Sequence, residues 1–253
     1  MTGNMRDPLQ ETRPQAGDRQ DEHLRAEFDL LADQYDLQHR RNIAISGEGP
    51  EYFAEYKIAD LAAFVATQHL PAARVLDFGG GIGSAVPFFR KHFGTSELYC
   101  ADVSARSIEI ARARFPGDEC HLLIDQSIPA SAHSFDIVFS ACVFHHIPHD
   151  EHAYWLAELR RVTRPGGVLA IFEHNPLNPL TVRAVNTCPL DVNARLIGGG
   201  TMRQRLLASG WQKPQLDYRV FFPGLFRRCR AVEKYLGWLA LGAQYRLLAR
   251  APE

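Results

Sequence analysis

The chain has no uninterrupted apolar run close to the length of about eighteen residues that a membrane-spanning helix needs. Its first residues lack the apolar stretch of a secretion signal, which favours a cytoplasmic location. The formal net charge is only -1 over 253 residues, so there is no excess of basic residues for binding nucleic acid. With 46% hydrophobic and 23% charged residues, the composition is that of a globular protein with a sizeable core.

Paired cysteines are also absent. Five cysteines are spread through the sequence without a C-x-x-C pair, namely Cys100, Cys120, Cys142, Cys188 and Cys229. This spacing predicts neither a disulfide framework nor a structural zinc site.

One histidine series has a spacing that metal ligands also show. His145, His149 and His152 could share one face of a helix, but Pro148 interrupts any continuous helix between them. We therefore predict that the chain binds no metal.

Glycine, in contrast, is concentrated where an apolar run ends. Residues 75–83 read VLDFGGGIG, which is typical of a buried parallel strand, a glycine turn and a helix that begins near Ser84. The dinucleotide fingerprint G-x-G-x-x-G fits poorly, because it requires a small residue at Ser84 or at Val86. Asp77 would repel a pyrophosphate and attract a cationic ligand, which favours S-adenosylmethionine. The simpler alternative is a strand-to-helix turn that only needs small residues.

Apolar periodicity organises the rest of the chain. Residues 1–21 are polar and predicted to be disordered, and 22–253 are predicted to form a single domain. Leu24, Phe28, Leu31 and Tyr35 recur at helical spacing, which predicts a helix over 24–38 before a second one over 51–68. Strands are then predicted at 74–78, 97–102, 120–124, 135–140 and 167–173, and helices near 84–93, 105–115, 151–161 and 201–209.

The last part of the chain differs from this alternation. Two strands at 212–222 and 244–250 would close the sheet with an antiparallel edge, and residues 175–199 are the least regular ordered stretch. A helix over 225–240 combines apolar and basic residues. Such a helix can touch an anionic membrane or hold a lipid-linked substrate, but the simpler interpretation is a core-packed helix with solvated charges.

Five segments, in this order, resemble the motifs of class I S-adenosylmethionine-dependent methyltransferases. They are DFGGGIG at 77–83, ADVS at 101–104, DQ at 125–126, FDIVFS at 135–140 and RPGG at 164–167. The resemblance covers residues 70–175 well and implies an α/β fold with a doubly wound, mainly parallel, seven-stranded Rossmann-like sheet and a helical N-terminal addition. The flanks 24–68 and 175–240 would then form the acceptor side.

The resemblance also implies a role for each motif. The glycines of the first motif would wrap the methionine part of S-adenosylmethionine, with Asp77 near its ammonium. Asp102, followed by Val103, would bind both ribose hydroxyls, and Asp125 with Gln126 would bind the adenine. The backbone around Ser140 would face the methionine, and Tyr35 would cover the cofactor. The cofactor-binding set is therefore Asp77, Gly79, Gly81, Gly83, Asp102, Val103, Asp125, Gln126, Ser140 and Tyr35. Two alternatives stay open, since Asp102 could instead cap a helix near Ser104 and Asp125 could start a turn.

Histidines supply the candidate catalytic bases, because the imidazole titrates near neutral pH. His145 and His146 follow the fourth strand, and Glu173 and His174 end the fifth. We predict His145 or His174 as the base, with at least one histidine of this region in a structural role. Glu173 or His174 would orient the acceptor or anchor the loop that follows.

Together these features predict an enzyme that transfers a methyl group from S-adenosylmethionine to a small-molecule or lipid-like acceptor, preferably to oxygen. The sequence predicts no nucleic-acid partner and no transmembrane segment, allows peripheral membrane contact, and leaves the oligomeric state open. Two alternatives are a catalytically silent S-adenosylmethionine-binding protein and a nicotinamide-dependent oxidoreductase, for which Asp102 would serve equally well.

Overall fold

The computed structural model describes residues 28–253. The predicted disordered tail at 1–21 and the first residues of the predicted helix 24–38 lie outside the described residues. The division of the chain into a tail and a single domain stays a prediction.

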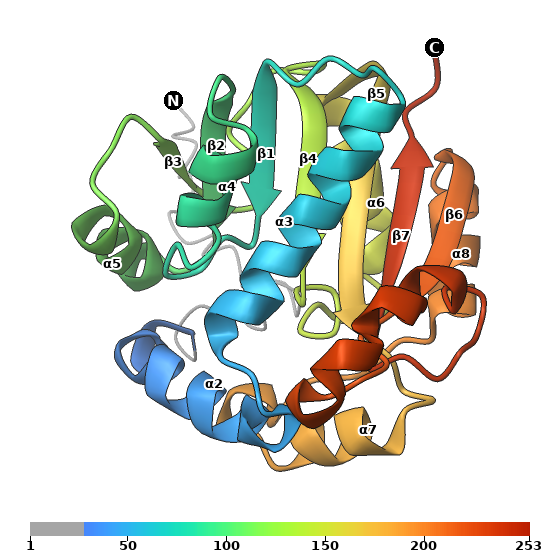
Figure 1. Cartoon of the computed structure of the whole chain (residues 1–253). Helices are drawn as coiled ribbons and strands as arrows, with labels where there is room; N and C mark the ends of the chain where they lie inside the picture. Colours follow the sequence, from blue (N-terminus) through green and yellow to red (C-terminus); the bar gives the residue numbers. More distant parts are fainter. Residues whose placement is uncertain (1–27) are drawn as a thin grey trace, which may run out of the picture.

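Seven strands form one sheet in the order β3-β2-β1-β4-β5-β7-β6 (Figure 1). They are β1 (Arg74–Phe78), β2 (Glu97–Asp102), β3 (Cys120–Leu123), β4 (Phe135–Ala141), β5 (Thr163–His174), β6 (Gln212–Arg219) and β7 (Gln244–Arg250). The first five are parallel, while β7 runs antiparallel between β5 and β6. The prediction of a doubly wound, mainly parallel sheet with an antiparallel edge is confirmed.

Helices cover both faces of the sheet. The helices are α2 (Tyr35–Ile43), α3 (Pro50–Thr67), α4 (Val86–His92), α5 (Ala105–Arg114), α6 (His152–Val162), α7 (Pro179–Asn186) and α8 (Gly199–Ala208). Both α3 and α4 pack on one face through a cluster that includes Ile58 and Phe89, and α6 and α8 pack on the other. Coverage of both faces explains why β4 is buried at every position except its last and is mainly apolar.

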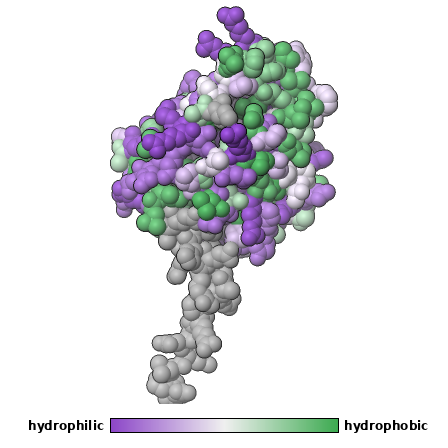
Figure 2. All heavy atoms as spheres, turned by 90° about the horizontal axis from the view of Figure 1, so that it is seen from below, coloured by the Kyte–Doolittle hydropathy of each residue, from purple (hydrophilic) through white to green (hydrophobic). Residues whose placement is uncertain are grey.

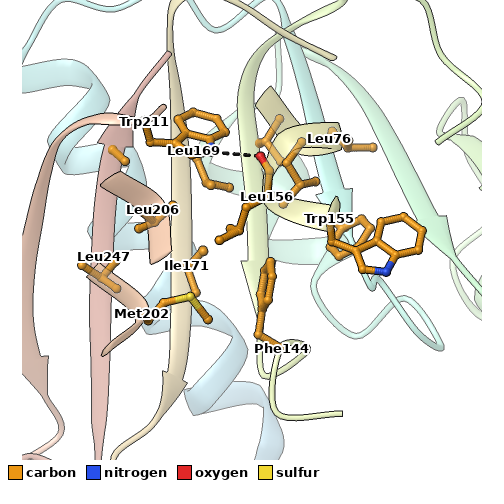
Figure 3. Packing of buried hydrophobic residues seen from close by; sticks show 14 of the residues in the cluster. Leu76, Phe144, Trp155, Leu156, Leu169, Ile171, Met202, Leu206, Trp211 and Leu247 are labelled. Carbon is orange, nitrogen blue, oxygen red and sulfur yellow. Dashed lines mark hydrogen bonds between the residues drawn. The ribbon is translucent and has the colours of Figure 1, made fainter. Parts of the chain in front are cut away.

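The hydrophobic cluster on the face covered by α6 and α8 also fixes the chain between α8 and β6 (Figure 3). Trp211 is 2% exposed, and its indole Nε1–H donates to the carbonyl oxygen of Leu156 in α6 at 3.0 Å. The same cluster contains Phe144, which follows β4. The core therefore holds the segment after β4, where the predicted histidines lie.

A helical cap lies beyond the carboxyl ends of the parallel strands, at the bottom of Figure 1. Residues 28–31 are helical and lead into η1 (Ala32–Gln34), α2 and η2 (Ala44–Ser46), and α7 and η3 (Pro189–Asp191) lie near them. The helical N-terminal addition is thus confirmed.

Two predictions about the second half of the chain need correction. The stretch 175–199 is not irregular throughout, because it contains α7 and η3. The start of α7 carries readable signals: Asn178 caps the helix by accepting from the amides of Leu180 and Thr181, and Pro179 occupies its first turn.

The predicted helix 225–240 is instead the 3-10 segment η4 (Gly224–Tyr235), with a kink at Phe226. None of its residues is buried, so the simpler interpretation of a core-packed helix is wrong. Within the described part of the chain, no helix combines the length and apolarity needed to cross a bilayer.

Candidate cofactor and acceptor site

A cavity of about 440 Å³ opens at the carboxyl ends of the parallel strands. The glycine turn after β1, the end of β2 and the segment after β4 form one part of its wall. The other part comes from α2, α7 and η3 of the helical cap and from the N-terminal half of α3. The crevice at the carboxyl ends of such strands is where open α/β sheets bind ligands.

The amides of the three consecutive glycines in the turn are already engaged by the protein. The amides of Gly79 and Gly80 donate to the carbonyl oxygen of Ala101 at 2.8 and 3.1 Å. The amide of Gly81 donates to Oδ2 of Asp102 at 2.8 Å. A pyrophosphate would need free amides in this turn, so the geometry disfavours a dinucleotide.

The three predicted glycines serve different purposes. A Cβ on Gly79 would lie 2.3 Å from a methyl carbon of Val143, and one on Gly83 would lie 3.0 Å from Cβ of Ala111 in α5. Gly83 is therefore needed for packing and does not line the cavity. A Cβ on Gly81 meets nothing within 4 Å, so this backbone is open to a ligand.

Asp77 is the unpaired acid of the site. It is 3% exposed, and its Oδ2 has no hydrogen-bond partner among the described residues. Burial, and secondarily the charge of Asp102, raise the pKa of Asp77 to about 7, although Lys57 acts in the opposite direction. A buried carboxylate without a partner is costly, so the position fits a ligand that brings a positive charge.

Asp102 joins the ends of β1 and β2. Its Oδ1 accepts from the amide of Ser104 at 2.9 Å, and its Oδ2 accepts from Gly81. Burial raises the pKa of Asp102, against the effect of these backbone hydrogen bonds. The cap of α5 is Ser104, whose hydroxyl accepts from the amide of Ser107. The alternative role of Asp102 as the helix cap is therefore wrong.

The remaining predicted cofactor residues divide into two groups. Val103, Asp125 and Tyr35 line the cavity together with the residues above. Gln126 is exposed outside the cavity lining, and only its carbonyl is engaged, by the hydroxyl of Tyr154. Ser140 is fully buried beneath the wall, and the neighbouring Ala141 and Cys142 line the cavity instead.

A buried network follows β4 and β5. Oε1 of Glu173 accepts from the amides of Val143 and Phe144 at 2.9 and 2.7 Å, and its Oε2 lies 2.6 Å from Nδ1 of His145. Asp191 Oδ1 lies 3.5 Å from Nε2 of both His145 and His146. Glu173 thus anchors the segment after β4 rather than the loop after β5.

The carboxylates determine how this network ionises. Burial disfavours the charged form of His145, but Glu173 and Asp191 outweigh burial and raise the pKa of His145 to about 10. Burial and the charge of His145 lower the pKa of His146 to about 3. The two neighbouring imidazoles therefore differ, with His145 protonated and His146 neutral at pH 7.

The rings of His149 and His152 lie 5.2 Å apart, but the described residues do not bring them together with His145 as one metal-binding group. His149 Nε2 is 3.3 Å from the carbonyl oxygen of Arg195, and His152 Nε2 is 3.1 Å from that of Ile147. His174, the second predicted base, lines the cavity and stacks near His145, with ring centroids 5.1 Å apart.

Lys57 and Cys142 line the cavity and were not predicted. Lys57 is 7% exposed on α3, and its Nζ lies 3.5 Å from Sγ of Cys142, which follows β4. The lysine forms no ion pair with a carboxylate among the described residues. A signal was present, because Lys57 precedes the buried Leu61 and Val65 at a spacing of four residues and so lies on the apolar stripe of α3.

We expect Cys142 to be the thiol that reacts fastest near neutral pH. Burial opposes ionisation, but Lys57 and His174 lower the pKa of Cys142 to about 7, against the negative charge of Glu173. Alkylation by iodoacetamide, followed by peptide mass spectrometry, should rise through a midpoint near pH 7. Lys57→Met should move the midpoint of Cys142 alkylation to higher pH, whereas Lys213→Met, at an exposed position, should leave it unchanged. A Cys142 midpoint near 9 in the wild type would contradict this expectation.

Comparisons with known proteins find similarity to methyltransferases. A family model described as a methyltransferase domain matches residues 76–171. The chain is 28% identical over 151 residues to a ubiquinone/menaquinone biosynthesis C-methyltransferase of Cupriavidus taiwanensis, covering 58% of each chain. It is 32% identical over 161 residues to a malonyl-[acyl-carrier protein] O-methyltransferase of Methylococcus capsulatus, covering 61% of this chain and 57% of that one. The chain thus spans less than two thirds of these relatives.

Among solved structures, the fold is similar to an S-adenosylmethionine-dependent methyltransferase of Thermotoga maritima, described as a possible histamine N-methyltransferase. The TM-score is 0.63 at 17% identity, and the match covers 90% of this chain and 100% of that one. At this identity the likeness establishes the fold.

Proposed function

We propose, since the chain belongs to the class I S-adenosylmethionine-dependent methyltransferase family, that it transfers a methyl group from S-adenosylmethionine to an oxygen atom of a small-molecule or lipid-like acceptor. The cofactor assignment depends mainly on the buried carboxylate of Asp77, whose Oδ2 is unpaired beside a glycine turn in which the amides of Gly79, Gly80 and Gly81 are already engaged. A cationic amino-acid head suits this position, whereas a diphosphate does not.

Different residues of the cavity would bind different parts of the cofactor. Asp77 would bind the ammonium, the open backbone at Gly81 would admit the methionine chain, and Asp102 would bind the ribose. Asp125 would lie at the adenine, and Tyr35 would cover the cofactor from α2. S-adenosylmethionine supplies the methyl group on a sulfonium, which is a good leaving group. The protein then has mainly to align the acceptor in a dry site, which is worth roughly 7–11 kcal/mol.

The wall opposite the glycine turn suits an apolar acceptor. It includes Phe28, Leu31, Phe53, Val185, Leu190 and Phe221. Exposed hydrophobic residues extend from α7 to η4, among them Leu180 at 59%, Leu225 at 86% and Trp238 at 77%. Figure 2 views the molecule from this end and shows hydrophobic patches on the right of the face. Arg227 and Arg228 stand beside Leu225, and this combination supports a lipid-like acceptor that arrives from an anionic surface.

Two polar groups in the same wall support oxygen as the acceptor atom. The ammonium of Lys57 favours an anionic or ionisable oxygen and opposes a cationic amine. His174 would accept the proton of a hydroxyl acceptor. His145 is the weaker candidate base, because carboxylates approach both of its ring nitrogens and only 2% of its side chain is exposed.

The test is transfer of radiolabelled methyl from S-adenosylmethionine to medium-chain carboxylic acids, alkylphenols and alkylamines of matched length. We expect product from the oxygen acceptors only. His174→Ala should lower turnover of the alkylphenol roughly 100-fold or more, while leaving the Kd for S-adenosylmethionine within about twofold. His69→Asn, on the exposed turn after α3, serves as the control. Cofactor binding without transfer to any acceptor class would favour the silent binding protein, and transfer to the amines alone would contradict the oxygen assignment.

A further inference from the structure

We propose that His145, His146 and Asp191 form a binding site for a first-row divalent metal ion of the zinc type, with one coordination position open toward the acceptor. Each residue offers one ligand atom, and the three atoms lie within 4.8 Å of one another. All three residues line the cavity. The site rests on geometry that the linear spacing of the histidines did not indicate.

The distances suit a metal better than a direct hydrogen bond. Nε2 of His145 and Nε2 of His146 each lie 3.5 Å from Oδ1 of Asp191, which is long for a hydrogen bond. A tetrahedral zinc ion with bonds of about 2.0–2.2 Å holds its ligand atoms roughly 3.3–3.5 Å apart. Two imidazole nitrogens and one carboxylate oxygen are also the donor set of catalytic zinc and iron sites.

The groups behind these ligands are those that a metal site needs. Nδ1 of His145 lies 2.6 Å from Oε2 of Glu173, and a carboxylate there orients the imidazole so that Nε2 faces the metal. Glu173 is itself held by the amides of Val143 and Phe144. Glu173 therefore acts as a positioning residue.

The other two ligands are also held in place. The ring of His146 packs edge-on against Phe28, with centroids 5.1 Å apart. The segment that carries Asp191 is tied to the first ligand, because the amide of Arg195 donates to the carbonyl oxygen of His145 at 2.7 Å. The ligands from the segment after β4 and from η3 would thus be fixed before a metal arrives.

The metal would act on the acceptor. Three protein ligands leave a fourth position in a tetrahedral site, and all three ligand residues line the cavity that would admit the acceptor. A hydroxyl oxygen bound there would lose its proton more easily. This consequence rests on the proposed function, whereas metal binding itself does not, so the two can fail separately.

The experiment titrates the metal-stripped full chain with Co²⁺ and follows its visible absorption, then displaces Co²⁺ with Zn²⁺. We expect one equivalent of Co²⁺ to bind. His146→Ala and Asp191→Asn should each weaken binding at least 100-fold, and Glu173→Gln should weaken it roughly 10–100-fold. His149→Ala is the matched control and should bind Co²⁺ like the wild type.

Two further measurements keep the outcome decisive. Zn²⁺ should raise the melting temperature of the wild type but not of His146→Ala, which separates a lost ligand from a lost fold. Binding of S-adenosylmethionine should persist in the stripped protein, which separates this site from the cofactor site. Failure of the wild type to bind either metal, or equal binding by the three variants, would overturn the proposal.

Discussion

Asp77→Asn is expected to raise the melting temperature of the empty protein above pH 7 and to weaken binding of S-adenosylmethionine at least 10-fold. Both effects come from one carboxylate, which is buried and has Oδ2 unpaired when no ligand is present. Burying this unpaired charge destabilises the empty protein, and a bound cationic ligand offsets that destabilisation. A substitution that stabilises the fold and weakens ligand binding is typical of a functional site.

The pH dependence follows from the sign of the pKa shift. The pKa of Asp77 is raised by burial from 3.8 to about 7, so the folded protein binds a proton that the unfolded chain releases. Stability is therefore lost as pH rises from about 4 to about 7, and Asp77→Asn removes this loss. Between pH 5 and pH 8 the advantage of the variant should grow by on the order of 2–3 kcal/mol, or several degrees in melting temperature.

Thermal unfolding and calorimetry test both parts. The wild type should bind S-adenosylmethionine more weakly as pH falls below about 7, because Asp77 takes up a proton, while the affinity of Asp77→Asn should not change with pH in this range. Asp118→Asn removes an exposed acid and controls for net charge. Equal cofactor affinity in Asp77→Asn and the wild type would refute the role of Asp77.

Most of the residues predicted to bind the cofactor line one cavity, and this could be read from the sequence because their signals are local. Asp77 and Gly81 follow a single strand, and Asp102 ends the next one, so strand register alone brings them together. The exceptions are predicted residues that do not line the cavity. Gly83 is required by packing against α5, and Ser140 lies under the wall, which spacing along the chain does not distinguish.

On the opposite side of the cavity, the sequence indicated the flanking segments and the histidines but not their partners, because these depend on contacts between distant segments. Asp191 reaches His145 from η3, and Lys57 reaches Cys142 from α3. Neither residue has a motif of its own. The prediction that η4 packs in the core was wrong for a related reason. Its amphipathic pattern is compatible with either the core or an exposed surface.

The second large effect is expected at Asp102. An ionised carboxylate has about four sites for accepting hydrogen bonds. The amides of Ser104 and Gly81 occupy one on each oxygen, which leaves two for the ribose hydroxyls. Asp102→Asn replaces one oxygen by an amino group that must then face a backbone N–H. We expect the variant to bind S-adenosylmethionine roughly 100-fold more weakly, since hydrogen bonds to a charged group contribute about 1.5–3 kcal/mol each.

Analogues of the demethylated cofactor that lack the 2′- or 3′-hydroxyl separate this contact from the structural role of Asp102. The wild type should lose affinity for each deoxy analogue, whereas Asp102→Asn should bind the analogues and the parent compound about equally, as a double-mutant cycle requires. Ser104→Ala is the structural control, because it removes the cap of α5 at a cost of about 1 kcal/mol without touching the ribose. It should retain the wild-type preference for the hydroxylated compound. If Asp102→Asn retains that preference as well, the ribose is bound elsewhere and Asp102 only shapes the turn.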